Sequence, residues 1–272
     1  MSSSGFPPDS SSADLAIRAL CSASREDDAA NLLLRNSSLH PDPFTYNFLV
    51  GRLAKTLSLS VVYSFIEDLR NSANILPDRI TYTILIDSVC RSRNLREATR
   101  LLSVLKHSGI KPDSYLYNNI MKAYCMLDQC GEVMDVYNKM KDEGIEPDLV
   151  TYNTLIYGLS NGMCRKGDTL GALKLLGEME ERGCSPNEFT YNALLMGLCK
   201  AGSLDKGVLL YKTMTDGGMK LESPTYATFL RSLCRGNKIA AAYEVFDYAR
   251  ESKSLSDEAA YSALESSLKR IK

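Results

Sequence analysis

Several residue types and patterns are scarce or missing in this 272-residue sequence, and each absence narrows what the chain can do. The only two histidines are His40 and His107, which excludes most catalytic and metal chemistry centred on histidine. No stretch approaches the ~18 consecutive apolar residues of a membrane-spanning helix, so an integral membrane protein is excluded. The 32 Lys and Arg residues are offset by 33 Asp and Glu residues. This balance excludes a globally basic nucleic-acid binder but not a local basic stripe.

The first 13 residues are rich in serine and proline, a composition that predicts a disordered leader. An organelle import signal is typically rich in arginine and poor in acidic residues. Here Asp9 and Asp14 precede the first arginine, Arg18, so no import signal is visible in this chain.

A tandem repeat occupies the rest of the sequence. Tyrosines recur at spacings of 36, 35, 35, 39, 35 and 35 residues, at Tyr46, Tyr82, Tyr117, Tyr152, Tyr191, Tyr226 and Tyr261. Pro-Asp or Pro-Asn precedes most of them, for example Pro77-Asp78 and Pro186-Asn187. The chain is therefore an array with a period of about 35 residues.

Each unit has the apolar periodicity of two helices. In residues 79–113 a polar break separates two apolar stripes, formed by Tyr82, Leu85, Ile86, Val89 and Cys90, and then by Leu95, Ala98, Leu101, Leu102 and Leu105. Gly109 and Pro112 are placed to end the second helix. One such hairpin cannot bury its stripes alone, whereas stacked neighbours bury a continuous core. The sequence therefore predicts an all-α fold, an α-solenoid of stacked helix-turn-helix repeats.

Six full repeats are expected, over residues 43–78, 79–113, 114–148, 149–187, 188–222 and 223–257. The fourth is four residues longer around residues 160–163, which we expect to enlarge the turn between its helices. Upstream, residues 14–42 form a shorter, degenerate N-terminal repeat. Downstream, residues 258–272 supply one helix that caps the last apolar face.

The repeat closely resembles the pentatricopeptide repeat, in strings such as VTYNTLI at residues 150–156 and GIEPD at residues 144–148. The resemblance covers nearly the whole chain past residue 42. The competing tetratricopeptide repeat has a period of 34 and a tryptophan in its helix signature. This chain has no tryptophan, a period of 35 and Pro-Asp junctions. It looks like a small protein of the pure-repeat (P) class found in plant organelles, which implies a right-handed α-solenoid.

The resemblance implies sequence-specific binding of single-stranded RNA, with one base bound per repeat. In the family, the residue after the tyrosine and the last residue of the same repeat recognise one base, and we call the two a base-reading pair. The pairs here are Asn47 with Asp78, Thr83 with Asp113, Asn118 with Asp148, Asn153 with Asn187, and Asn192 with Glu222. The family's code assigns U to Asn–Asp, G to Thr–Asp and C to Asn–Asn, so the first four repeats imply a 5′-U-G-U-C-like core. The fifth pair departs from the common ones and implies only a pyrimidine, and Ala227 with Asp257 implies no base.

Two further sets of residues support the RNA interpretation. In the family the second residue of each repeat packs against base faces, here Phe44, Ile80, Tyr115, Val150 and Phe189, with plain packing between repeats as the alternative. A basic residue recurs at the end of the first helix, at Lys55, Arg91, Arg165, Lys200 and Arg235, and only Met126 breaks the series. Registered charge in a neutral protein predicts a track of phosphate contacts, with a solvated helix end as the alternative.

The eight cysteines do not predict a metal site or a disulfide framework. Six share one repeat position, which Ala54 fills in the first full repeat: Cys21, Cys90, Cys125, Cys164, Cys199 and Cys234. A position that accepts Cys or Ala is a small core site, and no CxxC pair is present. The zinc-deaminase signature HxE…PCxxC is absent too. We therefore expect no metal, no cofactor, no small-molecule substrate and no enzymatic activity.

The family implies a non-catalytic RNA-binding protein of the mitochondrion, or alternatively the chloroplast, acting in splicing, processing, stability or translation of a transcript. Residue spacing does not imply this cellular role. Two alternatives stay open: a scaffold that binds protein in the solenoid groove, and a fragment of an RNA-processing enzyme whose catalytic domain lies beyond this chain. A protein partner or self-association also stays open, because five or six bound bases predict an affinity on the order of micromolar.

Overall fold

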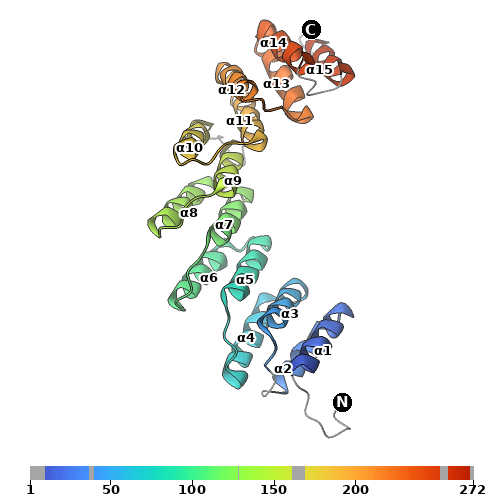
Figure 1. Cartoon of the computed structure of the whole chain (residues 1–272), viewed down its shortest axis with the longest axis vertical. Helices are drawn as coiled ribbons and strands as arrows, with labels where there is room; N and C mark the ends of the chain where they lie inside the picture. Colours follow the sequence, from blue (N-terminus) through green and yellow to red (C-terminus); the bar gives the residue numbers. More distant parts are fainter. Residues whose placement is uncertain (1–9, 37–39, 128, 161–168, 252–256, 270–272) are drawn as a thin grey trace. The chain divides into compact units, whose positions relative to one another are not determined.

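The computed structural model describes residues 10–36, 40–127, 129–160, 169–251 and 257–269. These residues form fifteen α-helices and no strand, arranged as successive hairpins (Figure 1). The first helices of the hairpins are α1 (Ser10–Ser22), α3 (Pro43–Thr56), α5 (Arg79–Arg91), α7 (Ser114–Met126), α9 (Leu149–Ser160), α11 (Glu188–Lys200) and α13 (Ser223–Arg235). The second helices are α2 (Glu26–Leu34), α4 (Leu59–Ala73), α6 (Leu95–His107), α8 (Cys130–Asp142), α10 (Thr169–Glu181), α12 (Leu204–Asp216) and α14 (Ile239–Glu251), and α15 (Asp257–Lys269) follows them. Of the helices in the described part of the chain, none has the length and apolar character needed to cross a membrane.

The helices belong to two compact units, Met1–Ala123 and Tyr124–Lys272. In the first unit α1 contacts α3 and α3 contacts α5, and in the second α9 contacts α11 and α11 contacts α13. Each of these first helices also packs against the second helix of its own hairpin. The first helices therefore form a row within each unit, and the prediction of a helical repeat solenoid is confirmed.

The apolar stripes expected from the sequence form the core. In α5 and α6 the buried side chains are Tyr82, Leu85, Ile86, Val89, Leu95, Ala98, Leu101, Leu102 and Leu105. Gly109 ends α6 with a φ of 75°, and its N–H donates to the Lys106 carbonyl at 2.9 Å. A left-handed residue at this point closes the helix, which a side chain would strain.

The two ends of the chain differ from the expected leader and cap in one respect. Helix α1 begins at Ser10 and Ala13 is buried, so the prediction of a disordered leader is wrong for residues 10–13. Residues 1–9 lie outside the described part of the chain. At the other end α15 packs on α13 and α14, with Leu264 buried and the Tyr261 ring 4.9 Å from the Phe246 ring.

The long fourth repeat changes the register of one core position. Helix α9 ends at Ser160, and the expected enlarged turn, with Cys164 and Arg165, lies outside the described residues. A Cβ on Gly197 would lie 2.7 Å from the Ser160 Cβ, and a Cβ on Gly158 would overlap Cys125 in the same way. Ser160 therefore occupies the small core position in the fourth repeat, and Cys164, which the sequence analysis assigned to that position, lies outside the described residues.

Candidate nucleic-acid interface

The last residue of most repeats caps the first helix of the next repeat. Its side-chain oxygen accepts a hydrogen bond from the backbone N–H three residues later, at 2.6–3.1 Å, for Asp42, Asp78, Asp113, Asp148 and Asn187. Short acidic or amide side chains suit this task because they reach back to the free N–H groups of the first turn. One member of each of the first four candidate base-reading pairs is thus fixed at a helix N-terminus.

In the first repeat the two members of the pair are in direct contact. The Asn47 amide nitrogen donates to both carboxylate oxygens of Asp78 at 3.1 Å. The Thr81 hydroxyl lies 2.7 Å from the Asn47 amide oxygen and 2.9 Å from Asp78 Oδ1. Asn47 is 5% exposed, so its amide is held in place by this network.

The fourth repeat has the same design with an amide in place of the carboxylate. Thr190 Oγ1 lies 2.6 Å from the Asn153 amide oxygen and 3.0 Å from Asn187 Oδ1. Thr81 and Thr190 therefore link the two members of their pairs, a role that the sequence analysis did not assign. A signal was present in the sequence, because a threonine precedes the repeated tyrosine in most repeats.

In the second repeat the structure does not join Thr83 to Asp113. The Thr83 hydroxyl donates to the Arg79 carbonyl one turn back, at 2.8 Å. Asp113 instead accepts from Arg79 Nη1 at 2.9 Å. Arg79 was not a predicted site residue.

The third pair is divided between the two compact units. Asn118, in the first unit, is buried, and Asp148, in the second unit, caps α9.

The fifth pair is also not joined through its side chains. The Asn192 amide nitrogen donates to the Glu188 carbonyl at 2.7 Å, and its oxygen accepts from the Glu222 backbone N–H at 3.0 Å. Glu222 makes no side-chain cap on α13 and is exposed. Both polar atoms of Asn192 are thus engaged by backbone. Of the sixth pair, Asp257 has a side chain outside the described part of the structure.

The predicted base-stacking side chains are exposed although they are apolar. Phe44, Ile80, Tyr115, Val150 and Phe189 are 44–67% exposed. Plain packing between repeats, the alternative, would bury them. An apolar side chain is thus left in solvent at the same position of five repeats.

Aromatic and cationic neighbours extend two of these positions. The Phe44 ring stacks on Phe48 with centroids 6.5 Å apart, and the Arg18 guanidinium lies 5.1 Å from the Phe44 centroid. The Phe189 ring stacks on Tyr157 at 5.8 Å. Phe48 and Tyr157 are 37% and 41% exposed, so the sequence analysis missed part of the aromatic surface.

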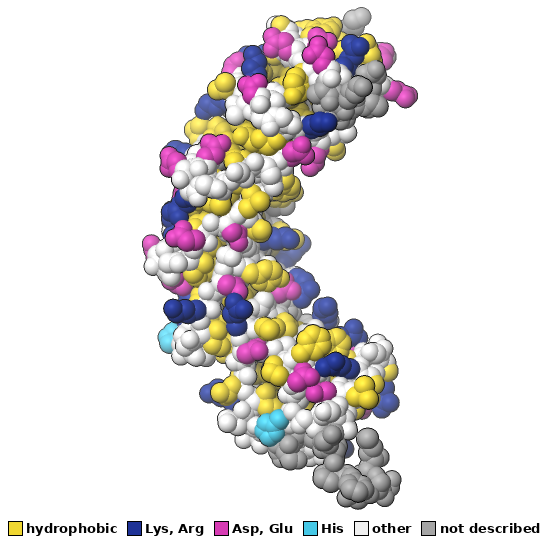
Figure 2. Space-filling model, in the orientation of Figure 1, with side chains coloured by type: hydrophobic (Ala, Val, Ile, Leu, Met, Phe, Trp, Pro, Cys, Tyr) yellow, Lys and Arg dark blue, Asp and Glu magenta, His cyan; other side chains and the backbone are white. Residues whose placement is uncertain are grey.

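The basic residues end the first helices as expected. Lys55, Arg91, Lys200 and Arg235 are exposed and lie in the last turns of α3, α5, α11 and α13, whereas Arg165 is outside the described residues. A cation in this position also stabilises the negative end of the helix dipole. Arg91 is paired with Asp87 at 2.8 Å, so a phosphate would compete with that carboxylate. Acidic and basic side chains both occur on the face of each unit drawn in Figure 2, so a phosphate track would be a local feature.

Several cysteines at the repeated position have thiols made less acidic by burial. Burial raises the pKa of Cys125 and Cys199 to about 11, and burial with the nearby Asp87 raises that of Cys90 to about 12. Within the described residues no cluster of three or more His, Cys, Asp or Glu side chains could hold a metal ion.

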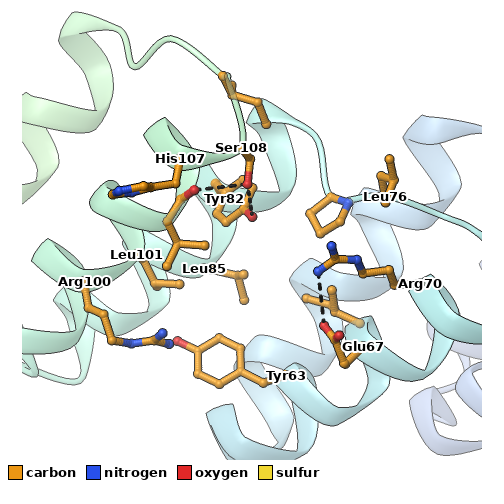
Figure 3. Close-up of a pocket in the computed structure, with 14 residues that line it drawn as sticks. Tyr63, Glu67, Arg70, Leu76, Tyr82, Leu85, Arg100, Leu101, His107 and Ser108 are labelled. Atoms are coloured by element: carbon orange, nitrogen blue, oxygen red, sulfur yellow. Dashed lines mark hydrogen bonds and ion pairs between the residues drawn. The ribbon is translucent and has the colours of Figure 1, made fainter.

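A cavity of about 570 Å³ lies among α4, α5 and α6 in the first unit (Figure 3). It is lined mainly by side chains of the second helices, such as Tyr63 and His107, and by no candidate base-reading or stacking residue. Two of its arginines already face carboxylates, Arg70 beside Glu67 and Arg100 beside Glu97. The cavity therefore lies apart from the candidate interface.

Comparison with known proteins places this geometry in a family. The PPR repeat family model matches residues 114–161, 161–200 and 189–235, and the PPR repeat model matches residues 73–106, together more than half of the chain. The chain belongs to the pentatricopeptide repeat (PPR) family.

Individual PPR proteins are similar over part of their length. The Arabidopsis thaliana pentatricopeptide repeat-containing protein At2g17670 is 50% identical over 111 residues, which are 40% of this chain and 24% of that protein. The crystal structure of the maize pentatricopeptide repeat protein PPR10 superimposes with a TM-score of 0.68 at 24% identity, over 97% of this chain and 37% of PPR10. PPR10 in complex with an 18-nt psaJ RNA element matches with a TM-score of 0.56 at 22% identity, over 97% of this chain and 43% of PPR10. The chain thus spans less than half the length of these relatives.

Proposed function

We propose that this PPR protein binds single-stranded RNA in a sequence-specific manner, with one base per repeat on the face formed by the first helices. The observation that carries the proposal is the contact between Asn47 and Asp78, residues 31 positions apart that meet at the start of α5. The Asn47 amide has both a donor and an acceptor, and uracil presents an N–H between two carbonyl oxygens. An amide and a carboxylate held side by side suit such an edge.

In this proposal the exposed apolar side chains contribute the stacking part of the binding energy. A base stacked between second-position residues of neighbouring repeats, such as Phe44 and Ile80, would remove both side chains from water. Stacking tolerates any base, so selectivity would come from the base-reading pairs. The similar fold of PPR10, which has been crystallised in complex with an 18-nt psaJ RNA element, supports RNA binding in general.

The fifth pair contributes no base selectivity in this proposal. The Asn192 amide is engaged by the backbone of Glu188 and Glu222, and Glu222 makes no side-chain cap, so this pair is not held together through its side chains as Asn47 and Asp78 are. The selected sequence is therefore the four-base core 5′-U-G-U-C-3′.

We further propose that the protein acts without catalysis on an organellar transcript, in the mitochondrion or alternatively the chloroplast. It would protect, remodel or present a short RNA segment during splicing, processing or translation. The relationship to a plant PPR protein supports this role.

The test is selection of a randomised single-stranded RNA pool on the purified protein, followed by sequencing of the retained molecules. Enrichment of U-G-U-C is expected. The variant Asp78→Asn provides a matched control because it creates the Asn–Asn pair of the fourth repeat. It should change the first base from U to C and leave the other three unchanged. A pool that stays random with the folded wild-type protein would refute the proposal.

A protein-binding scaffold is the second candidate. The near-zero net charge and the backbone-engaged Asn192 favour it. If RNA selection fails, capture of a partner by the wild-type protein that is lost on Phe44→Ala or Phe189→Ala would support a scaffold.

A further inference from the structure

In the second repeat an ion pair joins the first and the last residue of the repeat. Asp42, the last residue of the N-terminal repeat, also pairs with a cation, Arg18 at 3.1 Å, but that arginine comes from within α1. Arg79, the first residue of α5, donates from Nη1 to Oδ2 of Asp113 at 2.9 Å, across 34 residues of sequence. Asp113 is the last residue of the same repeat and caps α7 through its other oxygen. The corresponding first residues elsewhere are not cations: Pro43, Ser114, Leu149, Glu188 and Ser223.

The first repeat shows what the ion pair replaces. There, both carboxylate oxygens of Asp78 accept from the Asn47 amide, so the neighbour of the carboxylate is the other member of the pair. In the second repeat the Thr83 hydroxyl donates its hydrogen bond to the Arg79 carbonyl. The Thr83 oxygen is then left as an acceptor, and the donor beside the Asp113 carboxylate is the guanidinium of Arg79.

We propose that Arg79 is a specificity-determining residue that selects guanine at the second repeat, an inference that rests on the proposed function. Arg79 and Asp113 together present donor groups next to acceptor oxygens. Guanine presents the complementary groups on two adjacent edges, with N7 and O6 as acceptors on the Hoogsteen edge and N1–H and N2–H as donors on the Watson–Crick edge. Arg79 would donate to N7 and O6 while Asp113 accepts from N1–H and N2–H.

The same pair of side chains, Arg79 and Asp113, disfavours the other three bases. Adenine and cytosine place an amino group where O6 of guanine lies, so a donor would face the guanidinium. Uracil offers a carbonyl and an N–H in the right order, but its second carbonyl would face the Asp113 carboxylate. The ion pair is open to solvent on both sides, with 56% of the Arg79 and 37% of the Asp113 side chain exposed, so a base can reach it.

The test uses RNAs that differ only in the second base of U-G-U-C, carrying guanine, 7-deazaguanine, inosine or adenine. Inosine lacks the 2-amino group that Asp113 would contact, and 7-deazaguanine lacks the N7 acceptor of Arg79. Wild-type protein should lose about ten-fold in affinity for either analogue. Arg79→Ala should bind guanine and 7-deazaguanine equally and still discriminate against inosine. Arg79→Lys keeps the charge without the planar fork and should also lose the discrimination against 7-deazaguanine.

Arg91→Ala is the matched control, since Arg91 ends the same helix at a predicted phosphate position. It should weaken binding to all four RNAs by one common factor and preserve their ranking. Thermal melting followed by circular dichroism shows that each variant is folded.

Two results would overturn the inference separately from the proposed function. If Arg79→Ala lowers affinity for all four RNAs by one factor, as Arg91→Ala does, Arg79 only supplies charge. If Arg79→Ala leaves all four affinities unchanged, Arg79 does not touch the RNA. In both cases wild-type selection of U-G-U-C would still stand. If the wild-type protein binds all four RNAs with equal affinity, both the inference and the proposed function are refuted.

Discussion

Replacement of Asp78 by alanine should destabilise the first unit through two distinct losses. The Asp78 carboxylate caps α5 by accepting from the Thr81 N–H at 2.8 Å, and loss of such a cap costs about 1 kcal/mol. The same carboxylate also accepts from the buried Asn47 amide, which alanine would leave without its acceptor. An unsatisfied buried donor costs about 1–3 kcal/mol. Asp78→Ala should therefore lower the free energy of unfolding by about 2–4 kcal/mol.

Repeating the Asp78 substitutions in an Asn47→Ala variant separates the loss of the cap from the loss of the buried hydrogen bond. Asn47→Ala removes the buried amide, so that Asp78→Ala should then cost only the cap, about 1 kcal/mol. Asp78→Asn should cost less than 1 kcal/mol in either background, because asparagine caps as well as aspartate and Asn187 already does so in this chain.

The assay is equilibrium unfolding in urea, followed by circular dichroism for the four proteins of the Asn47/Asp78 alanine cycle. The informative quantity is the coupling energy, expected to be about 1–3 kcal/mol. Additive effects would refute the idea that the pair is one hydrogen-bonded unit. A cost for Asp78→Asn as large as that for Asp78→Ala would refute the capping role.

Three further predictions concern packing, thiol chemistry and charge. Gly158→Ala places a methyl group against Cys125 and should lower the free energy of unfolding in urea by about 1–3 kcal/mol. In a Cys125→Ala variant the same substitution should cost much less. Equal costs with and without Cys125 would contradict this contact. The pKa of Cys90 near 12 keeps its thiol protonated at pH 8, so iodoacetamide should label it about 1,000-fold more slowly in native than in urea-unfolded protein. Peptide mass spectrometry measures both labelling rates, and equal rates would contradict the burial of Cys90. Replacing both Arg91 and Lys200 by alanine should reduce the slope of log K against log salt by about 1.4 for single-stranded RNA, and an unchanged slope would remove the phosphate track.

The helices and their boundaries were predictable because the signals are local. Apolar spacing predicted the buried face of each helix, and Pro-Asp or Pro-Asn junctions marked the boundaries between repeats, as at Asp78 and Asn187, after which α5 and α11 begin. The contact between Asn47 and Asp78 was predictable only through the family resemblance. Spacing alone does not say which of two polar residues 31 apart will meet.

Other features of the interface depend on competition between partners in three dimensions. Asn47 and Asn192 occupy the same repeat position, yet one bonds a carboxylate and the other bonds backbone. The difference follows from the last residue of each repeat, because Glu222 is longer than Asp78 by one methylene and does not cap its helix. Arg79 was missed for a related reason, since its partner is 34 residues away and a single cation in one repeat leaves no periodic pattern.

In the proposed function, the last residue of a repeat has two tasks that demand the same side chain. Capping requires an oxygen on a short side chain close to the helix start, and base recognition requires a polar group fixed at that place. Asp and Asn meet both demands, which ties specificity to helix stability in repeats such as the first and the fourth. In the fifth repeat Glu222 meets neither, and α13 begins instead with Pro224 in its first turn, where the missing N–H costs little. Proline removes one N–H that would otherwise need a partner, but it offers no polar group to a base. A repeat that changes its last residue in this way keeps its fold while giving up its share of the recognised sequence.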